Sequence, residues 1–226
     1  ESMLADQELH RRAGLYAALG DPVRLAVAES LVAGDRTPTS LGAELGVSSN
    51  LMAHHVAILV DAGIVTRQPS EADRRRVYLQ LTPIGRTALR PSPITAPRVL
   101  FVCTHNSARS QFAQALWRRR SDVPVESAGT HPAPRIHPLA RKAARRHGLD
   151  MTGAVPQLLT TDTIRDALVV SVCDGADEDL SAHETAHLHW SVPDPVGQPE
   201  SAFMDAFDTI EDRVEQLSHA VTLEDS

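Results

Sequence analysis

The chain has 226 residues, of which 42% are hydrophobic and 23% are charged, and its formal net charge is −7. This length allows two domains of ordinary size, and the composition excludes fibrous and disordered proteins. No apolar run approaches the roughly 20 residues that a helix needs to cross a bilayer, so we expect no membrane association. Two cysteines are too few for a disulfide framework, which predicts free thiols in a reducing cytoplasm.

The charge is unevenly distributed along the chain. Residues 1–90 carry ten arginines and ten acidic residues, whereas residues 91–226 account for the whole net charge. Three prolines within residues 91–97 are typical of an extended linker. We therefore predict a first domain at residues 1–90, a linker at 91–97 and a second domain at 98–226, each with its own partner.

The first domain is predicted to be mainly helical. After a first amphipathic helix, Asp21 is the expected N-cap of a second helix, because Pro22 follows it. Two shorter helices are expected at residues 39–45 and 48–62, separated by a turn at Gly46. A short helix, a tight turn and a second helix predict a helix-turn-helix.

The second helix of this pair is expected to read DNA. Its inner face is predicted to be apolar: Leu51, Val56, Leu59 and Val60. Its N-terminal residues are expected to face the base edges: Ser48, Ser49, Asn50, Ala53 and His54.

A β-hairpin is predicted to follow, with strands at residues 64–67 and 77–81. Its tip carries Arg74, Arg75 and Arg76, and arginines there suit DNA phosphates or a minor groove. The order of elements predicts a winged helix-turn-helix. The alternative is a small helical domain with a solvated run of charge.

The segments LGDPVRLAVAESLVAG, SLGAELGVSSNLMAHHVAILVDAGIVTRQ and RRRVYLQLT resemble the ArsR family of winged-helix repressors. The resemblance implies a homodimer that binds a palindromic double-stranded operator and releases it when an inducer binds. Many arsenic-sensing members hold arsenite with cysteines, but residues 1–102 contain none. The side chains of His54 and His55 diverge by about 100° on a helix, so we expect no metal site in this domain.

The second domain opens on an apolar run, residues 99–102, that leads to Cys103. A small polar loop follows, and Arg109 and Ser110 begin a helical pattern that continues to about residue 119. A loop between a strand and a helix N-terminus gathers N–H groups into an anion site, and these groups with a guanidinium favour a thiolate. This arrangement predicts a nucleophile for phosphate or arsenate. The alternative is a buried cysteine with an unrelated surface arginine. The predicted oxyanion-binding residues are Thr104, His105, Asn106, Ser107, Ala108 and Arg109.

Strand and helix patterns alternate through the rest of the chain. Further strands are expected at residues 123–127 and 167–172, and helices at 138–147 and 202–220. Such alternation predicts an α/β domain with a parallel sheet whose ligands bind at the carboxyl ends of the strands. Cys173 follows one such strand, and Asp194 lies in a later proline-rich loop where it could move a proton.

The segments VLFVCTHNSARSQFAQALW, VESAGTHPAPRIHPLARKAARRHGLDMTG, VVSVCDGADED and HLHWSVPDPVG resemble the low-molecular-weight tyrosine phosphatase fold and, within it, the thioredoxin-type arsenate reductases. The resemblance implies that Cys103 attacks arsenate held by Arg109 and that Cys173 then forms a disulfide with Cys103, expelling arsenite. It also implies that Ser110 hydrogen-bonds the thiolate, Asn106 braces the loop and Asp194 serves the departing hydroxide.

Three positions depart from the patterns of these families. Leu180 stands where many of these reductases have a third cysteine, so the reductant is either thioredoxin attacking the disulfide directly or a small thiol such as mycothiol or glutathione. Gln114 replaces a glutamate that lines a potassium site in some relatives, so no such ion is expected. Val196 replaces a tyrosine that is common in the phosphatases, which favours a reductase.

The sequence thus predicts a repressor fused to an arsenate reductase with no bound cofactor. Two alternatives remain: a tyrosine phosphatase fused to a DNA-binding domain, and a non-catalytic repressor that senses an oxyanion. A metal site at His183, Glu184 and His187 on one helical face is the weaker alternative to a solvated surface.

Overall fold

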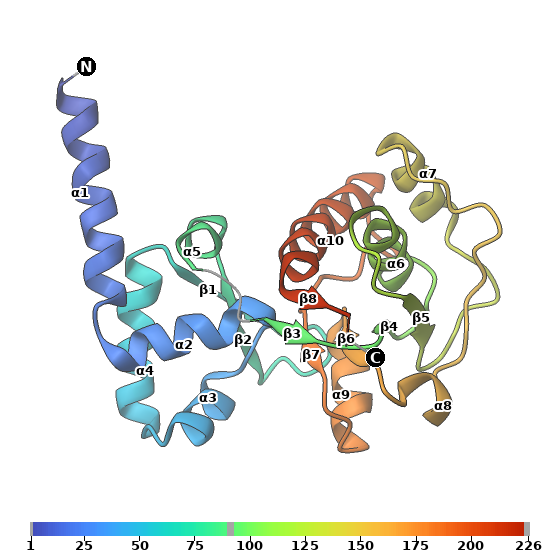
Figure 1. Cartoon of the computed structure of the whole chain (residues 1–226), viewed down its shortest axis with the longest axis horizontal. Helices are drawn as coiled ribbons and strands as arrows, with labels where there is room; N and C mark the ends of the chain where they lie inside the picture. The colour runs from blue at the N-terminus through green and yellow to red at the C-terminus, as the bar shows by residue number, and fades with distance from the viewer. Residues whose placement is uncertain (1, 90–92, 224–226) are drawn as a thin grey trace. The chain divides into compact units, whose positions relative to one another are not determined.

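The structure is a computed structural model that describes residues 2–89 and 93–223. The chain forms two compact units, one of residues 1–70 and 74–90 and the other of residues 71–73 and 91–226 (Figure 1). Residues 91 and 92 of the predicted linker lie outside the described residues. None of the helices within the described ranges combines the length and the apolar character needed to span a bilayer.

Five helices in the described part of the first unit have the following bounds: α1 Ser2–Leu19, α2 Pro22–Ala33, α3 Pro38–Leu45, α4 Ser49–Asp61 and α5 Pro83–Ala88. Asp21 is the N-cap of α2, as predicted, and its carboxylate accepts hydrogen bonds from the N–H groups of Val23 and Arg24, both at 3.0 Å. Gly46 ends α3 with φ +65°, a left-handed conformation that glycine adopts without strain. The predicted helix-turn-helix pair is therefore α3 and α4.

A β-hairpin completes the first unit. Strand β1, Val65–Pro69, pairs antiparallel with β2, Val77–Leu81. Helix α5 after it was not predicted, although Thr82 followed by proline is a start signal, and the Thr82 hydroxyl accepts a hydrogen bond from the N–H of Gly85 at 3.1 Å. Gly85 is also required sterically, because a Cβ there would lie 2.3 Å from the carbonyl oxygen of Ile64.

The core of the first unit is formed by residues of α1 to α4 and of the hairpin. In α4 the buried residues are Met52, His55, Val56 and Leu59. The prediction of Leu51 as part of this face is wrong, because its side chain is 47% exposed. Positions 52, 56 and 59 follow the spacing of one helical face, and position 51 lies about 100° away from position 52.

The second unit is built on a parallel sheet of four strands in the order β5-β4-β6-β7. The strands are β4 Val99–Cys103, β5 Val125–Gly129, β6 Leu168–Ser171 and β7 Leu188–His189, and the helices are α6 Arg109–Arg120, α7 Pro138–Arg146, α8 Thr161–Ile164, α9 Asp174–Ala182 and α10 Glu200–Ala220. All five residues of β4 are buried, which explains its continuous apolar run. This is the predicted α/β architecture.

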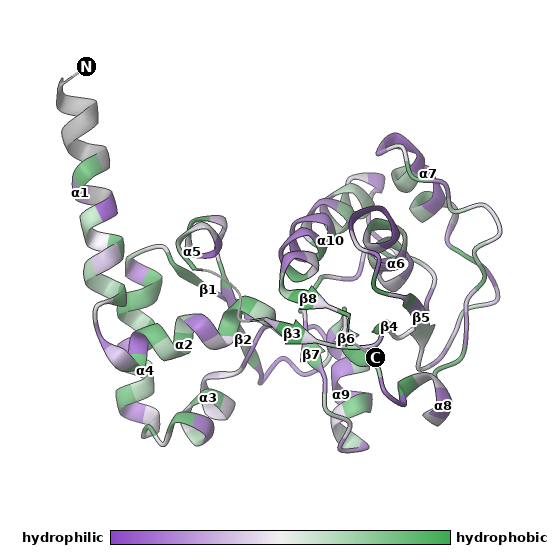
Figure 2. Ribbon diagram, viewed as in Figure 1, coloured by the Kyte–Doolittle hydropathy of each residue, from purple (hydrophilic) through white to green (hydrophobic). Residues whose placement is uncertain are grey.

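Helices cover the sheet through apolar faces. Helix α6 packs on β4 and β5 and against α10, while α9 packs against β4 and β6. Hydrophobic and hydrophilic residues alternate along α10, as the colours of Figure 2 show, and Phe203, Phe207 and Ile210 form part of its buried face. Phe207 meets Phe112 of α6 edge-to-face at a ring distance of 5.1 Å.

The structure differs from the prediction in part of the linker. Strand β3, Ile94–Thr95, pairs in parallel with β8, Val221–Thr222, and the N–H of Ala96 donates to the carbonyl of Thr222 at 3.0 Å. Ala96 is 4% exposed and belongs to the core of the second unit. Pro93 and Pro97, the two linker prolines that the structure describes, flank this short strand, but they do not reveal its distant pairing.

Candidate active site

The loop between β4 and α6 surrounds the sulfur of Cys103. Cys103 is 2% exposed and its Sγ accepts a hydrogen bond from the N–H of Asn106 at 3.1 Å. The Ser110 hydroxyl lies 3.0 Å from the same sulfur. Donors at these positions stabilise negative charge on sulfur, as the sequence leads us to expect of a nucleophile.

The loop turns its carbonyl groups away from this sulfur. The carbonyls of Cys103, Thr104, His105 and Ser107 accept hydrogen bonds of 2.8–3.2 Å from N–H groups within residues 130–137. Among residues 2–89 and 93–223, no group accepts a hydrogen bond from the N–H of His105, Ser107 or Ala108. Since an anion bound beside Cys103 would need such donors, these N–H groups form a candidate oxyanion cradle.

Asn106 holds the loop in shape. It has φ +48° and is completely buried. Its amide nitrogen donates to the hydroxyls of Ser110 at 2.8 Å and Ser127 at 2.9 Å. Its amide oxygen accepts from Gln111 Nε2 at 2.9 Å and from the N–H of Gln157 at 2.8 Å. All the hydrogen-bonding capacity of this amide is used to fix the loop, in agreement with a bracing role.

Arg109 lies buried at the start of α6. Its Nη1 donates to the carbonyl of Val192 at 2.8 Å, and its Nη2 lies 3.1 Å from Asp194 Oδ2. Burial alone would lower the pKa of Arg109, but negative charge on Cys173, on Cys103 and on Asp194 raises it overall. The guanidinium therefore stays charged and connects the loop with Asp194.

Cys173 occupies the carboxyl end of the neighbouring strand, β6, and caps helix α9. Its Sγ accepts hydrogen bonds from the N–H of Ala176 at 3.5 Å and from the N–H of Thr104 at 3.3 Å. Burial raises the pKa of Cys173, and negative charge on Cys103 raises it further, while Arg109 lowers it. The N–H of Thr104, one of the predicted oxyanion donors, donates to the second sulfur in this structure, and its role toward an oxyanion stays a prediction.

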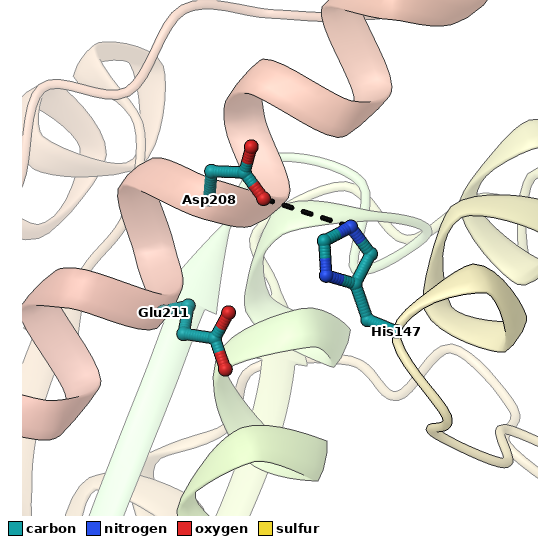
Figure 3. A group of neighbouring side chains, drawn as sticks. All are labelled: His147, Asp208 and Glu211. Carbon is teal, nitrogen blue, oxygen red and sulfur yellow. Dashed lines mark ion pairs between the residues drawn. The ribbon is translucent and has the colours of Figure 1, made fainter.

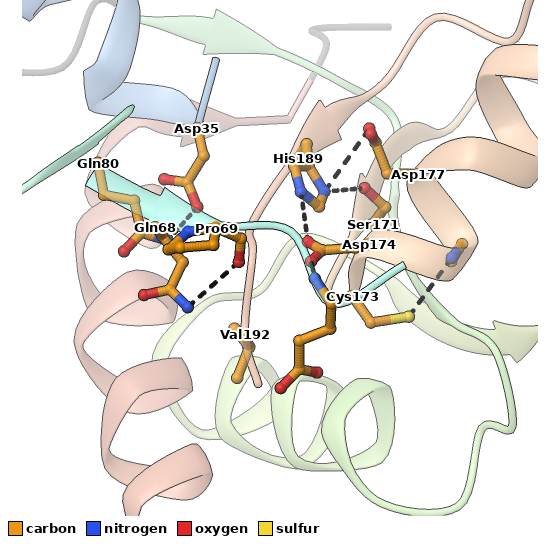
Figure 4. A network of polar contacts seen from close by, with 12 residues as sticks. Asp35, Gln68, Pro69, Gln80, Ser171, Cys173, Asp174, Asp177, His189 and Val192 are labelled. Atoms are coloured by element: carbon orange, nitrogen blue, oxygen red, sulfur yellow. Dashed lines mark hydrogen bonds and ion pairs between the residues drawn. The ribbon is translucent and has the colours of Figure 1, made fainter. Parts of the chain in front are cut away.

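A polar network that sequence reasoning missed supports the Cys173 segment (Figure 4). His189 Nδ1 lies 2.8 Å from the Ser171 hydroxyl, and His189 Nε2 lies 3.2 Å from Asp174 Oδ1. Burial raises the pKa of Asp174, but hydrogen bonds from His189 and Ser191 lower it overall. The signal available in the sequence was an aspartate directly after Cys173, which we did not use.

A cleft of about 650 Å³ lies beside the loop. Its lining includes His105 and Ser107 from the loop, Arg135 and His137 from the segment before α7, and Val196 from the loop after Asp194. Two imidazoles and a guanidinium lie among apolar side chains in this lining, and the size of the cleft suits a small molecule.

Leu180 is 2% exposed and packs in the core of the second unit. It occupies the position where a third cysteine was considered. The chain has two cysteines, Cys103 and Cys173, and both are free and buried. A thiol–disulfide relay in this chain is restricted to these two sulfurs.

Three side chains elsewhere come close enough to share a metal ion: His147, Asp208 and Glu211 (Figure 3). His147 Nε2 lies 3.6 Å from Asp208 Oδ1, and its ring stacks on Phe207 at 4.1 Å. Glu211 Oε1 is already paired with Arg120 Nη2 at 2.6 Å. An arginine already neutralises the charge of Glu211. We therefore interpret these three side chains as contacts between α7 and α10 and not as a cation site.

The alternative metal face at residues 183–187 is wrong. Helix α9 ends at Ala182, and Glu184 has φ +54°, so these residues do not share a helical face. His187 Nε2 instead lies 2.8 Å from Asp177 Oδ1.

The predicted DNA-reading residues lie at the exposed N-terminal end of α4. Ser48 is the N-cap, and Ser49, Asn50, Ala53 and His54 are all exposed. The exposed residues Arg74–Arg76 lie in the connection between β1 and β2. These positions agree with a helix and a wing that approach one duplex.

Family models match both units. The model of the low molecular weight phosphotyrosine protein phosphatase covers residues 98–226, and a helix-turn-helix domain covers residues 19–68. The chain is 33% identical over 132 residues to the arsenate reductase of Staphylococcus aureus (strain Newman), which covers 55% of this chain and 98% of that protein. It is 32% identical over 126 residues to the arsenate reductase of Bacillus cereus (strain AH187), covering 53% of this chain and 92% of that protein.

Solved structures agree with the fold of the second unit. A YwlE mutant from Bacillus subtilis covers 55% of this chain and 97% of its own, with 23% identity and a TM-score of 0.51. The tyrosine phosphatase Wzb from Escherichia coli K30, in complex with sulphate, covers 55% and 98%, with 21% identity and a TM-score of 0.51. The predicted fold is confirmed. Through residues 98–226 the chain belongs to the low molecular weight phosphotyrosine protein phosphatase family, joined to an N-terminal helix-turn-helix domain and similar along its second unit to arsenate reductases.

Proposed function

We propose that the second unit reduces arsenate to arsenite and that the first unit is an arsenic-responsive, ArsR-type repressor that binds operator DNA. The observation that best supports arsenate reduction is the pair of thiols on either side of Thr104. Cys103 lies in the loop with Arg109, and Cys173 accepts a hydrogen bond from the residue that follows Cys103. One thiol of such a pair can bond to arsenic and the other can complete a two-electron reduction.

In the first step, arsenate binds to the loop N–H groups and to Arg109. Cys103 Sγ attacks arsenic, a sulfur–arsenic bond forms, and one arsenic–oxygen bond breaks. Asp194, which lies 3.1 Å from Arg109 Nη2, relays a proton from water to this oxygen, so that the oxygen leaves as water. Ser110 and Asn106 keep the sulfur and the loop in the attacking geometry.

In the second step, Cys173 loses its proton to water and its Sγ attacks the sulfur of Cys103. The sulfur–sulfur bond forms as the sulfur–arsenic bond breaks, and its electron pair remains on arsenic, which passes from the +5 to the +3 state. Arsenite leaves, and an external thiol donates two electrons to restore both cysteines. Thioredoxin, mycothiol and glutathione are the candidate reductants, and all three belong to a reducing cytoplasm.

The experiment is an arsenate reduction assay on the full chain with each of the three reductants. Wild type is compared with Cys103→Ser, with Cys173→Ser and with Ser181→Ala, an exposed control on α9. We expect arsenite from wild type and Ser181→Ala and none from Cys103→Ser. Loss in Cys103→Ser without loss in Cys173→Ser would assign the second step to a small thiol.

Two other outcomes would contradict arsenate reduction. Turnover of an aryl phosphate without arsenate-dependent oxidation of thiols would favour a tyrosine phosphatase. Anion binding without turnover of either substrate would favour a non-catalytic oxyanion sensor.

For the first unit we propose a homodimer whose α4 helices enter successive major grooves of a palindromic operator. Exposed Ser49, Asn50 and His54 support base contacts, and Arg74–Arg76 support phosphate contacts. Selection from random duplexes identifies the operator, and mobility shifts then measure binding with and without arsenate or arsenite. Binding that neither compound changes would contradict an arsenic-responsive repressor.

A further inference from the structure

We propose that reduced Cys103 and Cys173 together bind trivalent arsenic as a dithiolate, which makes the second unit an arsenite receptor as well as an enzyme. The inference rests on the proposed function, because arsenite is the product released at this pair. The inference goes beyond that function because it proposes that arsenite stays bound to the two cysteines when they are reduced.

The two sulfurs are brought together by adjacent parallel strands. Strands β4 and β6 pair with Val102 opposite Ser171, and the N–H of Val172 donates to the carbonyl of Val102 at 2.7 Å. Cys103 and Cys173 therefore emerge at the same edge of the sheet. The main chain of Thr104, the residue after Cys103, lies 3.3 Å from Cys173 Sγ, and the Thr104 hydroxyl lies 3.4 Å from it.

Trivalent arsenic is a soft centre that prefers thiolates to carboxylates or imidazoles. The chain has no cysteine in residues 1–102, so two thiols for one arsenic atom are available at this site alone. The cluster of His147, Asp208 and Glu211 offers only nitrogen and oxygen ligands. Any response of this chain to arsenite through sulfur must therefore begin at Cys103 and Cys173.

The loop also suits the third ligand of such an arsenic atom. Arsenous acid exchanges two of its three hydroxyls for sulfur: two S–H bonds and two As–O bonds break, two As–S bonds form, and two waters leave. No atom is oxidised or reduced. The remaining hydroxyl projects toward the loop, where the N–H groups of His105, Ser107 and Ala108 and the guanidinium of Arg109 can hold its oxygen.

Two neighbouring features favour retention of the adduct. Both cysteines are 2% exposed, so water and competing thiols have restricted access to the sulfur–arsenic bonds. Gly175 lies against the Thr104 side chain, where a Cβ would come within 2.9 Å of its hydroxyl oxygen, so α9 and the loop are closely packed on this side. The pair is thus held in one geometry before arsenic binds, which lowers the entropic cost of a two-sulfur chelate.

The test is titration of the reduced full chain with sodium arsenite under anaerobic conditions. Native mass spectrometry counts bound arsenic, and a thiol reagent counts reactive cysteines. We expect one arsenic atom per chain and protection of both thiols in wild type and in Ser181→Ala. Each single variant, Cys103→Ser or Cys173→Ser, should bind on the order of 100-fold more weakly, because one sulfur loses the effective concentration that the second supplies.

A spectroscopic measurement keeps the inference testable if a serine variant folds poorly. X-ray absorption of the arsenite complex of wild type should give two sulfur neighbours and one oxygen neighbour around arsenic. A single sulfur neighbour, or equal affinity in wild type and Cys173→Ser, would overturn the dithiolate site.

The same preparations are assayed for arsenate reduction, which separates the two proposals. Reduction without stable arsenite binding would overturn the receptor and leave the enzyme. Arsenite binding at both sulfurs without reduction by any of the three thiol donors would overturn the enzyme and leave the receptor.

Discussion

The two cysteines occupy equivalent strand ends but differ in what surrounds them. Cys103 Sγ accepts a hydrogen bond from an N–H and lies beside a hydroxyl, and carbonyls of its loop bond to residues 130–137, which suits a nucleophile. Cys173 is buried against α9 and Thr104, and burial raises its pKa above the ordinary value of 9.0. The second thiol is therefore protonated at neutral pH, and in the mechanism that we propose it must lose its proton before it attacks.

This difference predicts a pH dependence for the second step. In a single turnover with excess arsenate, formation of the Cys103–Cys173 disulfide should accelerate from pH 7 through pH 9 without levelling off, because the thiolate fraction of Cys173 keeps rising. Rapid quenching with a thiol reagent and mass spectrometry measure the rate. A plateau below pH 8 would contradict the prediction.

Gly129 controls the position of the catalytic loop. A Cβ at this position would lie 2.8 Å from the carbonyl oxygen of Thr104 and 3.0 Å from the N–H nitrogen of Asn106. We expect Gly129→Ala to displace the loop and to lower kcat for arsenate at least about tenfold, while the free energy of unfolding falls by about 1–3 kcal/mol. Kinetics and urea denaturation measure the two effects.

The matched control is Gly14→Ala in α1, where an added Cβ has no neighbour within 4 Å. It should leave kcat unchanged. Equal activity of Gly129→Ala and Gly14→Ala would contradict a steric requirement at position 129.

At this scale the sequence predicts the residues of the loop well, because strand end, loop and helix start are adjacent in the chain. It does not reveal that Gln157 donates to Asn106 from 51 positions away. Nor does it reveal that the N–H of Thr104 is used by Cys173. Those contacts depend on how strands pair, which local patterns do not encode.

The element that carries Cys173 is anchored by a histidine–carboxylate pair. Strand β7 brings His187, the residue just before it, to within 2.8 Å of Asp177 on α9. Burial alone would lower the pKa of His187, but the hydrogen bonds to Asp177 and to the carbonyl of Thr185 raise it overall. A histidine with a raised pKa stabilises the folded state in its protonated form.

The stabilisation from His187 should be fully present below its unfolded pKa of about 6.5 and lost as the pH rises through the higher folded value. We expect the free energy of unfolding of the second unit to decrease from pH 6 toward alkaline pH more steeply in wild type than in His187→Gln. Urea denaturation at a series of pH values measures both slopes. Parallel slopes would show that this pair does not contribute.

The first residues of helices are the element boundaries that the sequence marks most clearly. Asp21 before Pro22 marks α2, and the same pattern of cap and proline recurs at Thr82 and Pro83, where we did not use it. The two-residue strands β3, β7 and β8 carry too little pattern to be recognised, since each is defined by a distant partner.

Across the whole molecule, two separate hydrophobic cores support the two activities that we propose. Leu31 is fully buried in the core of the first unit, and Leu116 is fully buried in the core of the second. Because each core contains its own set of residues, a cavity in one core should destabilise one unit preferentially.

Leu31→Ala should lower the free energy of unfolding of the first unit by about 2–5 kcal/mol. Operator binding should then be lost at a lower temperature, while arsenate reduction at 25 °C keeps its wild-type rate. Leu116→Ala is the converse variant, and it should reduce enzymatic thermostability without affecting DNA binding at 25 °C. Loss of both activities in both variants would contradict separate cores.

The buried Leu180 affects how oxidised cysteines of this chain can be reduced. An aliphatic side chain is packed at the position where a third cysteine would be needed. A disulfide between the two buried cysteines therefore cannot be passed on to a cysteine nearer the surface. In the mechanism that we propose, an external reductant must therefore reach Cys103 and Cys173 themselves in each oxidised chain. The fraction of oxidised chains then reports how the supply of arsenate compares with the supply of reductant.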